Sequence, residues 1–217
     1  MGFFDAFQLL VLGCLAVAGV GRAVLLQRRG VAVLAIDRER SVLQGLRDLA
    51  AVVLFGIWFW EAFAFAAGVD AHPTPAFLHG VLFRALPLRW LGAALMVAGL
   101  GVYVAGLGAF GDSWRLGIDR EKAGALVTTG IFARSRNPIY LALDLLLFGS
   151  FAVQGRALFG VLAVLTAGLL HELILREERF LQAHYGAAYR SYRIQVPRYW
   201  NLRDSPLSSG GTEGTVP

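Results

Sequence analysis

The sequence predicts an all-α integral membrane protein, a bundle of about five transmembrane helices followed by an amphipathic helix on the cytoplasmic side. Hydrophobic residues make up 57% of the 217 residues, charged residues only 16%, and the mean hydropathy is +0.60. Soluble domains contain about 25% charged residues. Several apolar segments are also long enough to cross a bilayer, and arginines gather at the ends of those segments.

The rest of the composition excludes other classes of protein. The net charge of +5 comes from arginines that flank apolar segments, so we expect a lipid bilayer as partner and no nucleic acid. Cys14 is the only cysteine, which excludes a disulfide framework and a thiolate metal site. The N-terminus lacks the basic region of a cleavable signal peptide.

The first two spans are expected at Phe3–Leu26 and at about Leu49–Val69. Ser41–Arg47 should wind into the second span. The second span should end at Asp70–Pro75, where two prolines stand among turn-forming residues.

The third span is expected at Trp90–Phe110, after a short amphipathic surface piece at 77–89. Gly92, Gly99 and Gly106 recur every seven residues within it. This spacing places three small residues near one helix face, where a neighbouring helix can approach closely.

The fourth and fifth spans, Ile139–Val153 and Ala157–Leu175, are joined by a tight hairpin at 154–156. A helix from Glu177 to about Arg193 should follow and lie along the membrane surface, because it is amphipathic and rich in aromatic residues.

Arginine placement predicts the topology. If the first and third connections and the C-terminal segment face the cytoplasm, only Arg84, Arg89 and Arg156 of the 20 Lys and Arg residues lie outside. We therefore expect a bacterial inner (cytoplasmic) membrane protein whose N-terminus is outside and whose active site faces the cytoplasm. Residues 1–203 should form one domain, and residues 204–217 a disordered tail.

A basic loop ends where the fourth span begins. Asn137 followed by Pro138 predicts a helix start, with the asparagine side chain as N-cap and proline in the first helical position. The free amides of that helix end, with Arg134 and Arg136 nearby, suit an anion.

An acidic pair, Glu177 and Glu178, lies just after the C-terminal end of the fifth span. Two carboxylates there suit a cation. A site with an anion-binding half and a cation-binding half at one membrane face is expected to bind a zwitterion that carries an extra positive charge.

These residues belong to a longer pattern that resembles the isoprenylcysteine carboxyl methyltransferase and phospholipid methyltransferase superfamily. The pattern spans 113–200 and consists of Leu126–Gly130, Arg136–Tyr140, Glu177-Glu178 and the aromatic run Tyr185–Tyr192 with Val196-Pro197. The resemblance implies an integral membrane enzyme that transfers a methyl group from S-adenosyl-L-methionine to a lipophilic or small-molecule acceptor.

The resemblance also implies a set of cofactor-binding residues. Glu177 would hold the amino group or the ribose of the cofactor, and Tyr189 and Tyr192 would close over the adenosine. No catalytic base and no metal ligand are implied. The implied cofactor-binding residues are Leu126, Val127, Phe132, Arg136, Asn137, Pro138, Tyr140, Glu177 and Glu178.

The sequence departs from the family pattern at two positions. Asn137 replaces the usual histidine and cannot titrate near neutral pH. Leu173 stands where the eukaryotic prenyl-protein enzymes have a substrate-contacting arginine, which argues against a prenylcysteine carboxylate as acceptor. A lipid amine, an isoprenoid acid, a small thiol and a modified protein stay open as acceptors.

Three further ionisable residues lie in or near the spans, where such groups are usually functional or paired. Asp144 is one turn past Tyr140, and either faces the cofactor or makes a structural hydrogen bond. His171 shares a helix face with Glu178 and is a candidate proton acceptor. For Glu61 the hypothesis is that it lines the acceptor cavity.

Two other functions are compatible with the sequence. A sterol-reductase-like enzyme carries a similar turn but uses NADPH, and a catalytically silent membrane scaffold could have kept the same helices. The sequence does not predict the oligomeric state.

Overall fold

The computed structural model describes residues 1–30, 41–110 and 126–200. Within these ranges the chain is helical and contains no strand beyond one isolated bridge, between Val81 and Arg156, which confirms the all-α prediction. The expected disordered tail at 204–217 lies outside the described residues, as do parts of the first and third connections.

Six α-helices and two 3-10 helices are described. Four of the α-helices are long and apolar enough to cross a membrane, and α4, with 17 residues, is shorter. The elements are α1 (Phe3–Arg28), α2 (Val42–Ala67), η1 (Ala76–His79), α3 (Leu86–Phe110), η3 (Gly130–Ala133), α4 (Pro138–Gln154), α5 (Ala157–Tyr185) and α6 (Ala187–Gln195).

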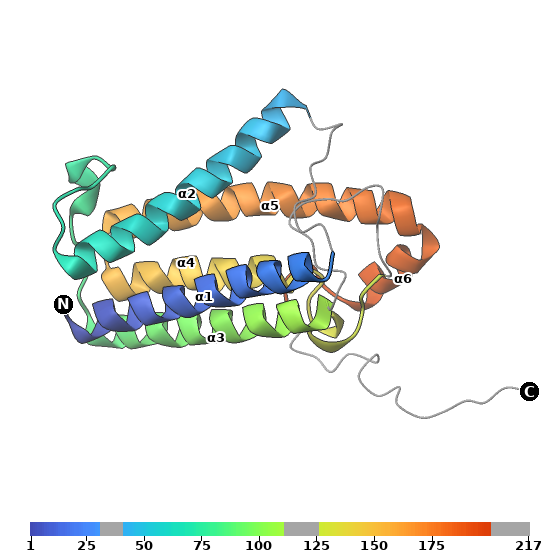
Figure 1. Ribbon diagram of the computed structural model, residues 1–217, viewed down its shortest axis with the longest axis horizontal. Helices are drawn as coiled ribbons and strands as arrows, with labels where there is room; N and C mark the ends of the chain where they lie inside the picture. The colour runs from blue at the N-terminus through green and yellow to red at the C-terminus, as the bar shows by residue number, and fades with distance from the viewer. Residues whose placement is uncertain (31–40, 111–125, 201–217) are drawn as a thin grey trace, which may run out of the picture.

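The long helices form a bundle with two distinct ends (Figure 1). α1, α3 and α4 run side by side, α5 lies along α4, and α2 crosses α5. η1 and the α4–α5 turn lie at one end of the bundle, while η3 and α6 lie at the other. Many large apolar side chains point outward, such as Val17, Val52 and Val164, which are 63% to 74% exposed. Lipid must cover these faces, because exposing so much apolar surface to water is energetically unfavourable.

The glycine face predicted on the third span packs against α4. A Cβ atom built on Gly92 would lie 2.6 Å from the carbonyl oxygen of Gly149. One built on Gly99 would lie 2.8 Å from the carbonyl oxygen of Ala142. The two backbones therefore approach too closely for any side chain at these positions.

Replacing Gly92 by alanine should lower the free energy of unfolding by about 1–3 kcal/mol, because the added methyl overlaps α4 backbone atoms. Unfolding in detergent, followed by circular dichroism, measures the change. Gly101→Ala is the matched control on the same helix, since a Cβ there meets nothing within 4 Å. Equal changes of stability in both variants would show that the close approach of α3 and α4 does not decide the effect.

Two predicted helix boundaries were wrong. α3 begins at Leu86, so part of the expected surface piece is helix, because a proline, here Pro87, fits the first turn. α5 continues through the acidic pair to Tyr185, since no breaker occurs before Gly186, whose φ is +53°. The separate amphipathic helix is therefore only α6, and it folds back toward η3.

Candidate functional site

The residues before α4 fold into a compact turn that leads directly into the helix. Directly after η3, the backbone amides of Arg134 and Ser135 both donate to the carbonyl oxygen of Ile131, each at 3.1 Å. α4 then begins at Pro138, with Asn137 as the N-cap residue. The predicted helix start is thus confirmed.

The expected side-chain cap by Asn137 was wrong. Its Nδ2 donates to Glu178 Oε1 at 3.1 Å and to the carbonyl oxygen of Arg198 at 3.2 Å, and no side-chain cap bond forms. A hydrogen bond to a carboxylate is stronger than one between neutral groups, so the acid competes successfully for the side chain. The first turn of α4 keeps amides that no side chain caps.

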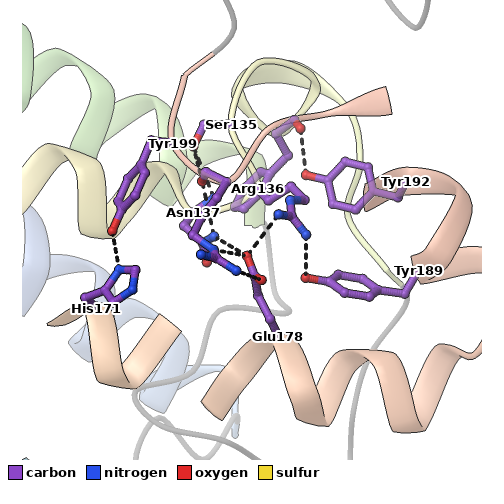
Figure 2. A network of polar contacts seen from close by, with 10 residues as sticks. Ser135, Arg136, Asn137, His171, Glu178, Tyr189, Tyr192 and Tyr199 are labelled. Carbon is purple, nitrogen blue, oxygen red and sulfur yellow. Dashed lines mark hydrogen bonds and ion pairs between the residues drawn. The ribbon is translucent and has the colours of Figure 1, made fainter. Parts of the chain in front are cut away.

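Glu178 is the centre of a buried polar network (Figure 2). Arg198 donates through Nε to Oε1 at 3.1 Å and through a terminal nitrogen to Oε2 at 2.9 Å. A second guanidinium, that of Arg136, lies 3.3 Å from Oε1. The side chains of Arg136 and Glu178 are only 7% and 8% exposed. Two cations and an amide therefore share one carboxylate, which leaves Glu178 without capacity for a further cation.

The segment after α6 returns to complete this network. The amide of Arg136 donates to the carbonyl oxygen of Pro197 at 3.1 Å, and the Tyr199 hydroxyl lies 2.6 Å from His171 Nδ1. Sequence reasoning missed Arg198 and Tyr199. The only available signal was that both directly follow Val196-Pro197, the last part of the family pattern.

Glu177 lies beside this network but has a different environment. Its Oε2 accepts a hydrogen bond from the Tyr140 hydroxyl at 2.8 Å. Among the described residues no cation pairs with Glu177, while the preceding Arg176 pairs with Asp48 on α2. Tyr140 and Glu177, far apart in sequence, therefore meet as expected, and the Glu177 carboxylate lacks a protein counter-ion within the described chain.

α6 covers the turn before α4 with two tyrosines. Tyr192 donates to the carbonyl oxygen of Phe132 at 2.7 Å, and Arg136 approaches the Tyr189 hydroxyl at 3.5 Å. Burial raises the pKa of Tyr189 to about 12, so its phenol is neutral at physiological pH. Leu126 packs against these two tyrosines. The result is an aromatic and apolar wall next to the charged network.

The remaining predicted residues occupy less specific positions. Pro138 is buried at the start of α4, and Val127 is half-buried next to Leu126. Asp144 has one buried carboxyl oxygen, and no hydrogen-bond partner for it exists within the described residues. The structural hydrogen bond considered for Asp144 is therefore not formed there. His171 contacts Tyr199 and not Glu178.

The fold and this site define a class: a polytopic helical membrane protein with a buried charged network at one end of its bundle. The model of a family described as phospholipid methyltransferase matches residues 88–188. The matched residues, just under half of the chain, are thus similar to the phospholipid methyltransferase family, and this likeness favours a membrane methyltransferase. None of the curated proteins matches the chain.

Proposed function

We propose that this protein transfers a methyl group from S-adenosylmethionine to a lipophilic acceptor at the cytoplasmic face of the membrane. The observation that carries the proposal is the contrast between the two adjacent acids. Glu178 is neutralised by Arg136 and Arg198, whereas within the described residues the Tyr140 hydroxyl is the one hydrogen-bond partner of Glu177. A partly buried carboxylate without a cation suits the ammonium group of an amino-acid-like ligand.

The other groups nearby fit the rest of this cofactor. The buried Nε of Arg136 has no hydrogen-bond partner within the described chain, Arg134 is exposed, and the first turn of α4 lacks a side-chain cap. Each of these features favours an anion such as the cofactor carboxylate. The wall formed by Leu126, Tyr189 and Tyr192 suits a flat aromatic base.

The chemistry needs little from the protein beyond position. S-adenosylmethionine supplies a methyl group on a sulfonium, and transfer forms the acceptor–carbon bond while the carbon–sulfur bond breaks. The residues of this chain would fix the donor through Glu177, hold it in line with the acceptor and exclude water. A proton from a neutral amine acceptor would leave to solvent, so no catalytic base is required.

Two residues favour an amine-bearing lipid as the acceptor. The buried Asp144 oxygen lacks a partner within the described chain and lies one turn from Tyr140, so it can accept a hydrogen bond from an amine. Leu173 supplies no positive charge for an acidic acceptor. A carboxylate acceptor would also meet the charge of Glu177.

Orientation follows from the distribution of arginines. Arg89 and Arg156 lie at the bundle end that carries the α4–α5 turn, where each donates to a backbone carbonyl oxygen. Most other described arginines belong to helix ends and turns at the opposite end of the bundle. The positive-inside rule then assigns the end with Glu177 to the cytoplasm, where S-adenosylmethionine is available.

Calorimetry on the purified protein in detergent tests the cofactor. We expect saturable binding of S-adenosylhomocysteine and none of NADPH, because Glu177 matches an ammonium group that NADPH lacks. Binding of NADPH alone would replace the proposal with a reductase. Binding of neither compound would favour a silent scaffold.

A further inference from the structure

A second polar cluster lies at the end of the bundle opposite the network around Glu178 (Figure 1). It contains Glu61 of α2, His72 of the following connection and His79 of η1. Glu61 is fully buried, and His72 and His79 are partly buried. Glu61 lies in the C-terminal part of α2 and pairs with His72 of the connection that follows, and its hypothesised place in an acceptor cavity stays a prediction.

We propose that Glu61, His72 and His79 form a zinc-binding site. One ligand atom from each residue lies within 4.8 Å of the other two. His72 Nδ1 is 2.5 Å from one carboxylate oxygen of Glu61. Ligands that share a tetrahedral zinc ion at about 2.0–2.1 Å stand about 3.3 Å apart. The His72–Glu61 separation is shorter than this value and all three atoms lie within 4.8 Å of one another, so side-chain rotations can bring them to a common ion.

The ligand types identify the metal. Two imidazoles with one carboxylate favour zinc and related transition metals, whereas magnesium and calcium prefer oxygen ligands. Three protein ligands leave a fourth position for water. Thr74 lies beside two of the proposed ligands: its hydroxyl donates to Glu61 Oε1 at 2.5 Å and is 2.9 Å from His79 Nε2.

The backbone around the cluster is held by bonds that do not involve the ligand atoms. Trp60 Nε1 donates to the carbonyl oxygen of Ala71 at 2.6 Å, which fixes the connection to α2. Arg156 donates to the carbonyl oxygen of His79 at 2.7 Å and stacks over the Phe65 ring at 4.0 Å. The Phe65 ring in turn lies 4.5 Å from that of His72. Such support keeps the ligands close to one geometry, as a metal site requires.

A bound zinc ion would have a clear structural effect. It would neutralise the buried charge of Glu61 and cross-link α2 to the connection that leads to α3. Since the two clusters lie at opposite ends of the bundle, this role is independent of methyl transfer. Failure of either proposal leaves the other unchanged.

Metal analysis of the full-length protein, purified in detergent without a histidine tag, tests the site. After incubation with Zn²⁺ and gel filtration, we expect one zinc ion per chain by mass spectrometry. His72→Ala combined with His79→Ala should lose it, and Glu61→Gln should weaken zinc binding at least about tenfold. Co²⁺ should give the visible absorption of a tetrahedral site in the wild type only. Mg²⁺ should not compete.

His184→Ala is the matched control, because His184 is an exposed histidine in the last turn of α5, outside the cluster, and its replacement should leave zinc binding unchanged. Helicity and elution volume show whether each variant is folded. S-adenosylhomocysteine affinity should be the same in the histidine variants and the wild type. Wild-type protein that retains no more zinc than the double variant would overturn the proposal and identify the cluster as a hydrogen-bonded ion pair.

Discussion

Replacing Glu177 by glutamine should weaken S-adenosylhomocysteine binding by about 10- to 100-fold. A hydrogen bond to a charged partner contributes about 1.5–3 kcal/mol, and the amide has the size of the carboxylate but no charge. The Tyr140 hydroxyl can still donate to the amide oxygen, so the melting temperature should not change. Calorimetry and a labelled-methyl assay measure affinity and rate on the same preparation.

Glu172→Gln provides the control for this prediction. Glu172 lies on α5 as well, is exposed, and pairs with Arg47 at 3.6 Å on the surface. Its replacement should leave both affinity and stability unchanged, since exposed ion pairs contribute little. If Glu177→Gln bound the ligand as tightly as the wild type, the ammonium group would have to lie elsewhere.

The sequence was sufficient to predict those parts of the structure that depend on hydrophobicity and on residue spacing. The spans, the glycine face of α3 and the start of α4 follow from local patterns that tertiary contacts do not override. The meeting of Tyr140 with Glu177 also followed, because a helix hairpin brings the start of α4 next to the C-terminal part of α5.

Long-range polar contacts could not be predicted in the same way. Asn137 has the residue type and position of a cap, but a carboxylate on α5 takes its side chain. Arg198 enters the site from a segment with no periodic pattern. Glu61 and His79 are 18 positions apart, and only the path of the chain through η1 brings them together. Each case depends on which distant segments the folded backbone brings together. The local propensities of the residues do not contain that information.

Replacing Glu178 by alanine should lower the free energy of unfolding by about 3 kcal/mol or more. The variant would leave Arg136 almost fully buried without a counter-ion and would free Arg198, and breaking a buried ion pair costs about 3–5 kcal/mol. It would also remove the acceptor of the Asn137 side-chain amide. The turn before α4 and the segment at 196–199 would then no longer be held by the same carboxylate. Unfolding by sodium dodecyl sulfate in mixed micelles measures the change.

A double-mutant cycle separates the buried charge from the general loss of packing. Adding Arg136→Met to Glu178→Ala removes the unpaired guanidinium but keeps an apolar side chain, so part of the lost stability should return. The two substitutions should then cost clearly less together than the sum of their separate effects. Additive costs would mean that Arg136 and Glu178 contribute independently. In that case the network would not hold the start of α4 against α5, and the distinct roles assigned to Glu177 and Glu178 would lose their structural basis.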